Sequence, residues 1–163
     1  MTDIFSQEKR SKIMSAVASA GTSPELLVRR LLHSMGFRFR THRQDLPGRP
    51  DIILPRYKTA IFVHGCFWHR HGCRRTTTPE NNAEYWERKF LRNRARDARN
   101  LASLASLAWR IAIIWECSLK PKHISATIGT LVDWIIHSEN SFISIGEDRT
   151  GQVELIHRLP GEV

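Results

Sequence analysis

The chain has 163 residues, of which 41% are hydrophobic and 25% are charged. This length and composition suit one globular domain, residues 1–163, with a core that needs no disulfide bonds. The net charge of +9 favours an anionic partner, with nucleic acid ahead of an anionic membrane surface. No apolar run approaches the roughly 20 residues that span a bilayer, and the N-terminus lacks a signal-peptide pattern. We therefore expect a cytoplasmic protein without membrane contact.

The basic excess is confined to two segments of the chain. The net charge is +5 over residues 1–50, +1 over 51–69, +5 over 70–99 and −2 over 100–163. A single Lys or Arg is best interpreted as solvated surface. Two basic segments that flank a Cys/His-rich stretch predict the two sides of a cleft for an anionic ligand.

Residues 1–40 predict two helices and a strand. Residues 7–18 can form a short basic helix within the N-terminal segment. Apolar spacing predicts an amphipathic helix over 24–35, with Ser23 as its N-cap and Gly36 at its end. Alternation over residues 37–40 predicts a strand with one solvent-exposed face.

The remaining elements alternate between strands and helices. In chain order they are strands at 51–54 and 59–64, an irregular loop at 65–78, a long basic helix at 83–107, a nearly continuous apolar strand at 109–115, a helix at 123–137 and weak strands at 142–145 and 152–156. This order predicts a three-layer α/β domain in which helices flank a central mixed sheet. No role is assigned to residues 139–163 beyond these weak strands.

The densest chemistry lies between His64 and Cys73. The three cysteines, without a signal sequence, indicate reduced thiols or metal ligands. A Cys₃His zinc site can be built from one loop and the end of the strand at 109–115, with His64 and His69 as alternative histidine ligands. Three unrelated thiols remain the simpler interpretation of the spacing alone. The four proposed ligands are Cys66, His71, Cys73 and Cys117.

Acidic side chains are scarce around this stretch, which makes each of them a candidate. Asp51 opens a predicted strand and could hold a hard cation such as Mg²⁺, although a turn-forming Asp is the simpler interpretation. His69 or His64 could act as general base if Asp97 orients it. Asp97 lies in an Arg-rich helix, where an ordinary ion-pair partner is the simpler interpretation. Glu25 fits the first turn of its helix for electrostatic reasons alone.

Aromatic side chains lie among the basic residues. Phe67, Trp68 and Trp86 could stack on bases or wedge between base steps, or they could cover the Cys/His-rich loop as local core. Met14, on the N-terminal basic helix, is a further candidate wedge.

Several motifs together resemble one family, the very short patch repair (Vsr) DNA mismatch endonucleases of bacteria. The resemblance runs from about Arg10 to Cys117. It rests above all on LPGRPD at 46–51 and FVHGCFWH at 62–69. It continues through Arg10-Ser11-Lys12-x-Met14, His71-x-Cys73, Trp86, Asp97, Leu107-Ala108-Trp109-Arg110 and Trp115-Glu116-Cys117.

This resemblance implies a fold, a reaction and a set of reacting groups. The fold is restriction-endonuclease-like, and the reaction is a nick in one strand, 5′ of the thymine in a T:G mismatch left by deamination of 5-methylcytosine. Asp51 is implied as a Mg²⁺ ligand together with the Val63 backbone carbonyl. His69 is implied as the general base, with Asp97 as its partner. His64 would assist at the scissile phosphate, and Glu25 belongs to the same site.

The resemblance also implies a structural Zn²⁺ ion and a DNA-binding surface. Cys66, His71, Cys73 and Cys117 match the zinc ligands. Phe67, Trp68 and Trp86 match intercalating aromatics, Met14 would enter from the opposite groove, and Arg10 and Lys12 would lie near phosphates in a DNA-contacting segment, residues 1–20. The partners implied are double-stranded DNA carrying a T:G mismatch and, by analogy, mismatch-repair proteins. Nicking one strand at an asymmetric mismatch requires only a monomer.

The chain departs from the pattern of the wider restriction nucleases in the strand after Asp51. That strand reads Ile61-Phe62-Val63-His64 and lacks their second acid and lysine, so the site must rely on Asp51 and histidines. Val63 replaces a hydroxyl residue that is common among family members. The alternative hypotheses are a noncatalytic, zinc-containing DNA-binding module and a nuclease of different specificity.

Overall fold

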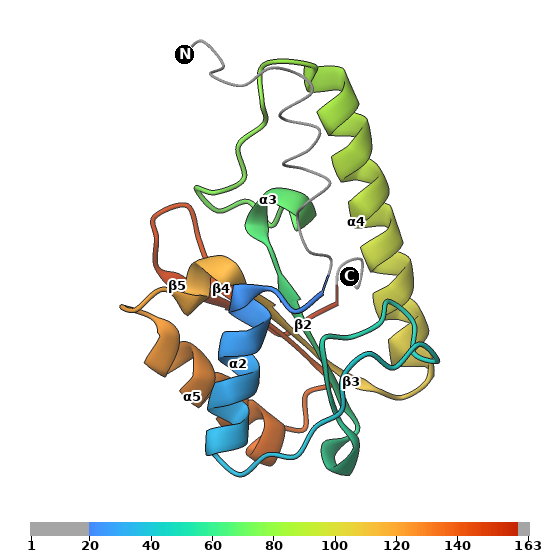
Figure 1. The fold of residues 1–163 in the computed structure, drawn as a ribbon, viewed down its shortest axis with the longest axis vertical. Coiled ribbons are helices and arrows are strands. Elements are labelled where there is room, and N and C mark those ends of the chain that lie inside the picture. Colours follow the sequence, from blue (N-terminus) through green and yellow to red (C-terminus); the bar gives the residue numbers. More distant parts are fainter. Residues whose placement is uncertain (1–19, 160–163) are drawn as a thin grey trace.

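The structure is a computed structural model that describes residues 20–159. Its centre is a five-stranded sheet in which the strands lie in chain order (Figure 1). The strands are β1 (Ile52–Leu54), β2 (Thr59–His64), β3 (Arg110–Trp115), β4 (Phe142–Glu147) and β5 (Val153–Ile156). The three inner strands are parallel, whereas β1 and β5 pair antiparallel at the edges, which confirms the predicted mixed sheet.

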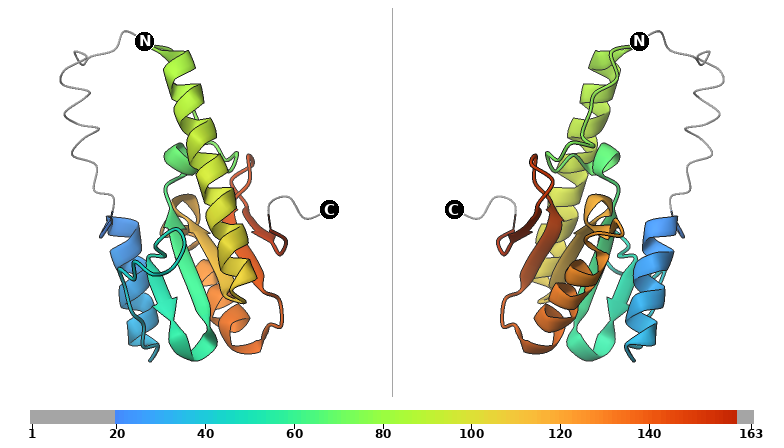
Figure 2. Two further views of the ribbon diagram at one scale, coloured as in Figure 1. Left: turned by 90° about the vertical axis from the view of Figure 1, so that its right-hand side faces the viewer. Right: turned by 90° about the vertical axis from the view of Figure 1, so that its left-hand side faces the viewer.

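Helices cover both faces of this sheet. The helices are α2 (Ser23–Ser34), α3 (Cys66–His69), α4 (Ala83–Ser106) and α5 (Ile124–His137), with short 3₁₀ turns η1 (Pro55–Tyr57) and η2 (Glu116–Leu119). Figure 2 shows α4 in front of the sheet in one view and α5 in front of it in the opposite view. The predicted α/β architecture with flanking helices is therefore confirmed.

Alternation along the strands explains the two packed layers. On β2, Ile61 and Val63 point to the core shared with α2 and α5, whereas Ala60 and Phe62 point to the core beneath α4. Every residue of β2 is buried, as is expected for an inner strand covered on both faces. The end of β2 therefore leads directly into the space between α2 and α4.

The helix predicted over 24–35 is present, but its N-cap is Thr22 rather than Ser23. The Thr22 hydroxyl accepts a hydrogen bond from the Glu25 amide, and Pro24 lies in the first turn where its missing N–H costs nothing. The helix ends at Ser34 with Met35 as its C-cap, and Gly36 follows with a φ of +89° that suits glycine.

The strand predicted over 37–40 is wrong. Only one bridge forms there, because Arg40 exchanges backbone hydrogen bonds with Ile53. The extended course breaks at His42, whose φ is +57°. The loop that follows contains Pro47 and Pro50, which lack the N–H that a ladder needs.

The C-terminal segment contributes to the sheet. The weak strands predicted at 142–145 and 152–156 are confirmed as β4 and β5. β4 is buried along its whole length and pairs with β3, so residues 142–147 complete the core. The loop predicted over 65–78 contains the single turn α3. No helix within residues 20–159 is long and apolar enough to cross a membrane.

Candidate active site

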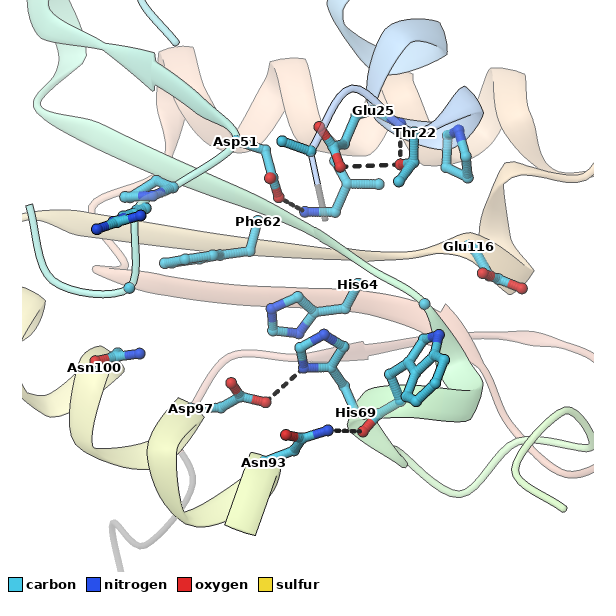
Figure 3. A pocket seen from close by; sticks show the side chains of 18 of the residues that line it. Thr22, Glu25, Asp51, Phe62, His64, His69, Asn93, Asp97, Asn100 and Glu116 are labelled. Carbon is cyan, nitrogen blue, oxygen red and sulfur yellow. Dashed lines mark hydrogen bonds and ion pairs between the residues drawn. The ribbon is translucent and has the colours of Figure 1, made fainter. Parts of the chain in front are cut away.

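A cleft of about 930 Å³ opens where β1 begins and β2 ends. Figure 3 shows Asp51 and Glu25 on one side of it and His64, His69 and Asp97 on the other, with Phe62 between them. The structure therefore brings together all five side chains proposed for the reaction. They come from α2, the residue before β1, the end of β2, α3 and α4.

Asp51 is held by the main chain of the neighbouring strand. The Val63 amide donates a hydrogen bond to Asp51 Oδ2 at 2.7 Å, and no donor among residues 20–159 reaches Oδ1. Burial raises the pKa of Asp51 to about 6, although the Val63 hydrogen bond opposes the shift and the nearby Glu25 charge adds to it. A buried carboxylate with one unused oxygen is the donor that a hard cation requires.

His69 and Asp97 form a hydrogen-bonded pair across the gap between α3 and α4. His69 Nδ1 lies 2.5 Å from Asp97 Oδ2, and both side chains are about four-fifths buried. Burial raises the pKa of Asp97, but the bond to His69 and the surrounding positive charges outweigh burial and lower it overall. This contact orients the ring and leaves Nε2 for an external proton, as a general base requires.

His64 lies directly on the ring of His69. The two rings are stacked with centroids 3.8 Å apart and planes 5° apart. Burial first, and then the charge of His69, lowers the pKa of His64 to about 3, so its imidazole is neutral at physiological pH. Its Nδ1 is buried without a hydrogen-bond partner within the described part of the chain.

Glu25 lines the cleft, but both of its oxygens are engaged. Oε2 accepts from the Gly21 amide at 2.8 Å and from Arg29, and Oε1 accepts from the Thr22 hydroxyl at 3.0 Å. This is a variant of the capping box that closes the first turn of α2. Glu25 is therefore near the site, as the resemblance implies, but it is already bonded to protein groups.

The single turn α3 connects the cleft to the Cys/His cluster. The Gly65 and Cys66 carbonyls accept the hydrogen bonds that close this turn. Within four residues it carries the thiol of Cys66, the rings of Phe67 and Trp68, and the imidazole of His69. Movement of Cys66 would therefore move His69.

Four ligand-type side chains converge behind α3. The ligand atoms of Cys66, His71, Cys73 and Cys117 lie within 4.8 Å of one another, and the three thiols are reduced and buried. Hydrogen bonds from the Cys66 thiol and from His71 lower the pKa of Cys117 to about 4, which favours a thiolate there. Zn²⁺ holds sulfur at about 2.3 Å and nitrogen at about 2.0 Å in a tetrahedron. The donor set therefore fits zinc.

His71 fits into this cluster through close packing with the sheet. Its ring stacks on Trp115 with centroids 4.1 Å apart, and the Trp115 indole donates to Ser144 at 2.9 Å. A Cβ at Gly146 would lie 2.9 Å from both the His71 and Trp115 rings. The absence of a side chain at Gly146 therefore makes room for the histidine of the cluster.

The three aromatic candidates form one group above the cleft. Phe67 contacts Trp68, Trp86 and Phe90 with centroids 5.0 to 5.5 Å apart, and Lys89 lies over the Trp68 ring. Trp86 is only 5% exposed, whereas Phe67 and Trp68 are partly exposed. The local-core interpretation therefore applies to Trp86 in this structure, while Phe67 and Trp68 are accessible.

Some candidates lie outside the described residues, and some lining residues were not predicted. The candidates outside the described residues are Arg10, Lys12 and Met14. The residues that line the cleft without having been predicted are Arg29, Asn93, Arg49, Arg96 and Glu116. Sequence position gave a signal for most of them. Arg29 follows Glu25 by one helical turn, Arg49 immediately precedes Pro50, and Asn93 and Arg96 precede Asp97 on α4.

Comparison with known proteins identifies similar sequences. A family model described as DNA mismatch endonuclease Vsr matches residues 2–75, a range that contains Asp51, His64 and His69. The chain is 53% identical to the type II nicking enzyme V.XorIIP of Xanthomonas oryzae pathovar oryzae over 119 residues, 73% of this chain and 88% of that protein. It is 38% identical to the DNA mismatch endonuclease Vsr of Escherichia coli over 138 residues, 83% of this chain and 88% of that protein. It is also 43% identical to the type II nicking enzyme V.NmeAIP of Neisseria meningitidis over 124 residues, 76% of this chain and 89% of that protein.

Proposed function

Since the chain belongs to the Vsr family of DNA mismatch endonucleases, we propose that it nicks one strand of duplex DNA on the 5′ side of the thymine in a T:G mismatch. The proposed reaction is hydrolysis of one phosphodiester bond with the help of Mg²⁺. The observation that carries this proposal is the placement of Asp51 opposite the His69–Asp97 pair in one cleft. The mixed sheet, with its site at the end of β2, supports a restriction-endonuclease-like domain.

Asp51 and the Val63 carbonyl are the groups that would hold the Mg²⁺ ion. The fit rests on the unused Oδ1 of Asp51 and on a pKa that burial raises to about 6, since a nearby cation would stabilise the buried carboxylate. When bound, Mg²⁺ supplies charge stabilisation to the phosphate oxygens. Val63 would contribute only its backbone carbonyl. The absence of the side-chain hydroxyl common among family members therefore does not affect this role.

The histidine side of the cleft supplies the proton transfer. Asp97 holds His69 through Nδ1, so Nε2 can take a proton from the attacking water. His64 stacks against the same ring and limits its rotation. His64 is a neutral imidazole whose Nδ1 is buried, so Nε2 is the ring nitrogen that would hydrogen-bond at the scissile phosphate.

We assign a structural role to zinc at Cys66, His71, Cys73 and Cys117. Its place behind α3 would fix the turn that carries His69 and the aromatic residues. Phe67 and Trp68 would then wedge between base steps, and Trp86 would join them if the aromatic group opens on DNA. A T:G wobble deforms more readily than a matched pair, so wedging favours the mismatch.

Two partner hypotheses accompany this function. A monomer suffices, because one strand is cut at an asymmetric mismatch. Mismatch-repair proteins remain a proposed partner by analogy alone. We place the reaction in the cytoplasm, where the protein would associate with the nucleoid when bound to DNA.

Strand-resolved cleavage of labelled duplexes tests the proposal. T:G duplexes and matched C:G controls in several methyltransferase-site contexts are incubated with Mg²⁺. We expect a single nick 5′ of the mismatched thymine, absent from C:G duplexes and lost in Asp51→Ala. Equal cleavage of T:G and C:G would instead indicate a nuclease of different specificity, and binding without cleavage in every context would indicate a noncatalytic DNA-binding module.

A further inference from the structure

Arg29 connects α2 to Asp51, the residue before β1. It lies one turn after Glu25 on α2, and its side chain is 13% exposed. One nitrogen, Nη2, lies 2.9 Å from the Asp51 carbonyl oxygen and 3.3 Å from Glu25 Oε2. Its Nε is buried without a hydrogen-bond partner in residues 20–159. A nearly buried guanidinium in this position serves the residues that it contacts rather than solubility.

The contact with Arg29 restrains the main chain of Asp51, whereas the contact with Val63 restrains its side chain. The Val63 amide restrains the carboxylate, and Arg29 restrains the carbonyl of the same residue. β1 begins only at Ile52, so ladder hydrogen bonds do not secure Asp51. Its position therefore depends on these two contacts.

Arg29 also balances a buried charge. Glu25 is 3% exposed, and Arg29 is its ion-pair partner within the described part of the chain. Without a cation there, the Glu25 carboxylate would add a second negative charge beside Asp51. Arg29 thus allows two carboxylates to line one cleft, and Glu25 in turn orients Arg29 from one helical turn away.

We propose that Arg29 is a positioning residue for the Mg²⁺ site, oriented by Glu25 and acting on Asp51 through its main-chain carbonyl. The proposal rests on the proposed function, because it gives Asp51 the role of metal ligand. It gives Glu25 an indirect role, because both Glu25 oxygens already accept hydrogen bonds from protein groups. Groups that orient metal ligands typically change metal affinity by about 10- to 100-fold when they are removed.

The test measures nicking of the T:G duplex as a function of Mg²⁺ concentration for the full-length wild type and three variants. Arg29→Met removes the charge and both contacts. Arg29→Lys keeps the charge but replaces the rigid guanidinium, whose Nη2 bonds both Glu25 and the Asp51 carbonyl, by an ammonium on a flexible stem. Arg30→Met removes an exposed arginine from the same helix and is the matched control. Duplex binding without Mg²⁺ and the thermal melting temperature are measured in parallel.

For Arg29→Met we expect the half-maximal Mg²⁺ concentration to rise about tenfold or more. Duplex binding without Mg²⁺ should change less than about twofold, and Arg30→Met should keep the wild-type Mg²⁺ dependence. Arg29→Lys should show a smaller rise in the same direction. A merely structural role would lower the folded fraction, and with it the maximal rate, without shifting the Mg²⁺ midpoint.

An unchanged Mg²⁺ midpoint in folded Arg29→Met overturns the proposal while leaving the proposed function intact. If Arg29→Met does not fold, Arg29→Lys decides, and a wild-type midpoint in that variant overturns the proposal. Failure of the wild type to nick T:G in a Mg²⁺-dependent way would overturn the proposed function and, with it, this assignment.

Discussion

On one side of the cleft Asp51 accepts a hydrogen bond from a main-chain amide, whereas on the other side Asp97 is bonded to the imidazole of His69. The consequences for the two carboxylates are opposite. The pKa of Asp51 is raised to about 6, mainly by burial, while the pKa of Asp97 is lowered because its bond to His69 and nearby charges outweigh burial. The Asp51 side is therefore the one that a cation would stabilise.

This difference separates the roles of the two sides. A carboxylate whose charge is poorly compensated is suited to binding a cation, and a carboxylate already paired with a histidine is suited to orienting that ring. The same difference predicts that substitutions on the two sides affect stability, metal dependence and rate in distinct ways.

The largest expected effect follows Asp51→Asn. Nicking should fall by at least about 10³-fold, because the amide is a poor ligand for Mg²⁺. The folded-state pKa of Asp51 lies above its ordinary value, so the ionised form destabilises the fold, in full above about pH 6 and not at all below about pH 4. In Mg²⁺-free buffer at pH 7.5 the variant should therefore be more stable by about 1–3 kcal/mol. Strand cleavage and urea denaturation measure the two effects.

The matched control for this substitution is Asp45→Asn on the exposed loop that precedes Asp51. Asp45 pairs with Arg43 in solvent, so neither rate nor stability should change appreciably. A loss of stability in Asp51→Asn would contradict the assignment of Asp51 as an electrostatically strained group.

A smaller loss is expected on the histidine side. Asp97→Asn should lower the rate about 10²-fold, since the amide lacks the negative charge beside His69 and can turn its NH2 toward Nδ1, which favours the wrong tautomer. The Mg²⁺ concentration for half-maximal nicking should remain that of the wild type. Asp133→Asn on the exposed face of α5 is the control. A shifted Mg²⁺ midpoint in Asp97→Asn would place the cation with the histidines instead.

The pH dependence should report the Asp51 side. As the pH falls through about 6, Asp51 takes up a proton and can no longer bind the cation. At subsaturating Mg²⁺ the rate should therefore drop about tenfold per pH unit below 6. Saturating Mg²⁺ should shift this acidic limb of the pH–rate profile to lower pH, because the cation competes with the proton for Asp51. A limb that is independent of Mg²⁺ would contradict its assignment to Asp51.

The smallest effect tests the link between α3 and the Cys/His cluster. Gly146→Ala would place a methyl group 2.9 Å from the His71 ring and should loosen the cluster. We expect faster loss of zinc to a chelator and a destabilisation of about 1–3 kcal/mol, with the Mg²⁺ midpoint unchanged. Gly129→Ala, where nothing lies within 4 Å, is the control. Wild-type zinc release from Gly146→Ala would disprove the packing argument.

Periodicity predicted the main elements of the fold because burial follows it. The long helix, the apolar strand at its end and the final helix all lie where their patterns place them. Residues 37–40 show the limit, since alternation cannot reveal that His42 and two prolines leave the segment without a ladder. The strand predicted at 142–145 is present, but its inner place in the sheet depends on pairing with β3, which no local pattern reveals.

The candidate site was predictable mainly through its motifs. Spacing did not decide whether His64, His69 or His71 completes the cysteine cluster. The structure groups His71 with the cysteines and the other two histidines with Asp97. Arg29 was missed because its partner is a main-chain carbonyl 22 positions away. A side-chain pattern carries no signal for such a contact.

Metal binding to the protein–DNA complex tests the central claim most directly. Mn²⁺, as a spectroscopic substitute for Mg²⁺, is titrated into T:G duplex complexes of His69→Ala and Asp51→Asn, and bound ion is measured by electron paramagnetic resonance. The account predicts that the His69→Ala complex binds one more Mn²⁺ ion than the Asp51→Asn complex does. Equal binding by both variants, or binding lost only with His69, would show that the cation does not belong to the Asp51 side of the cleft.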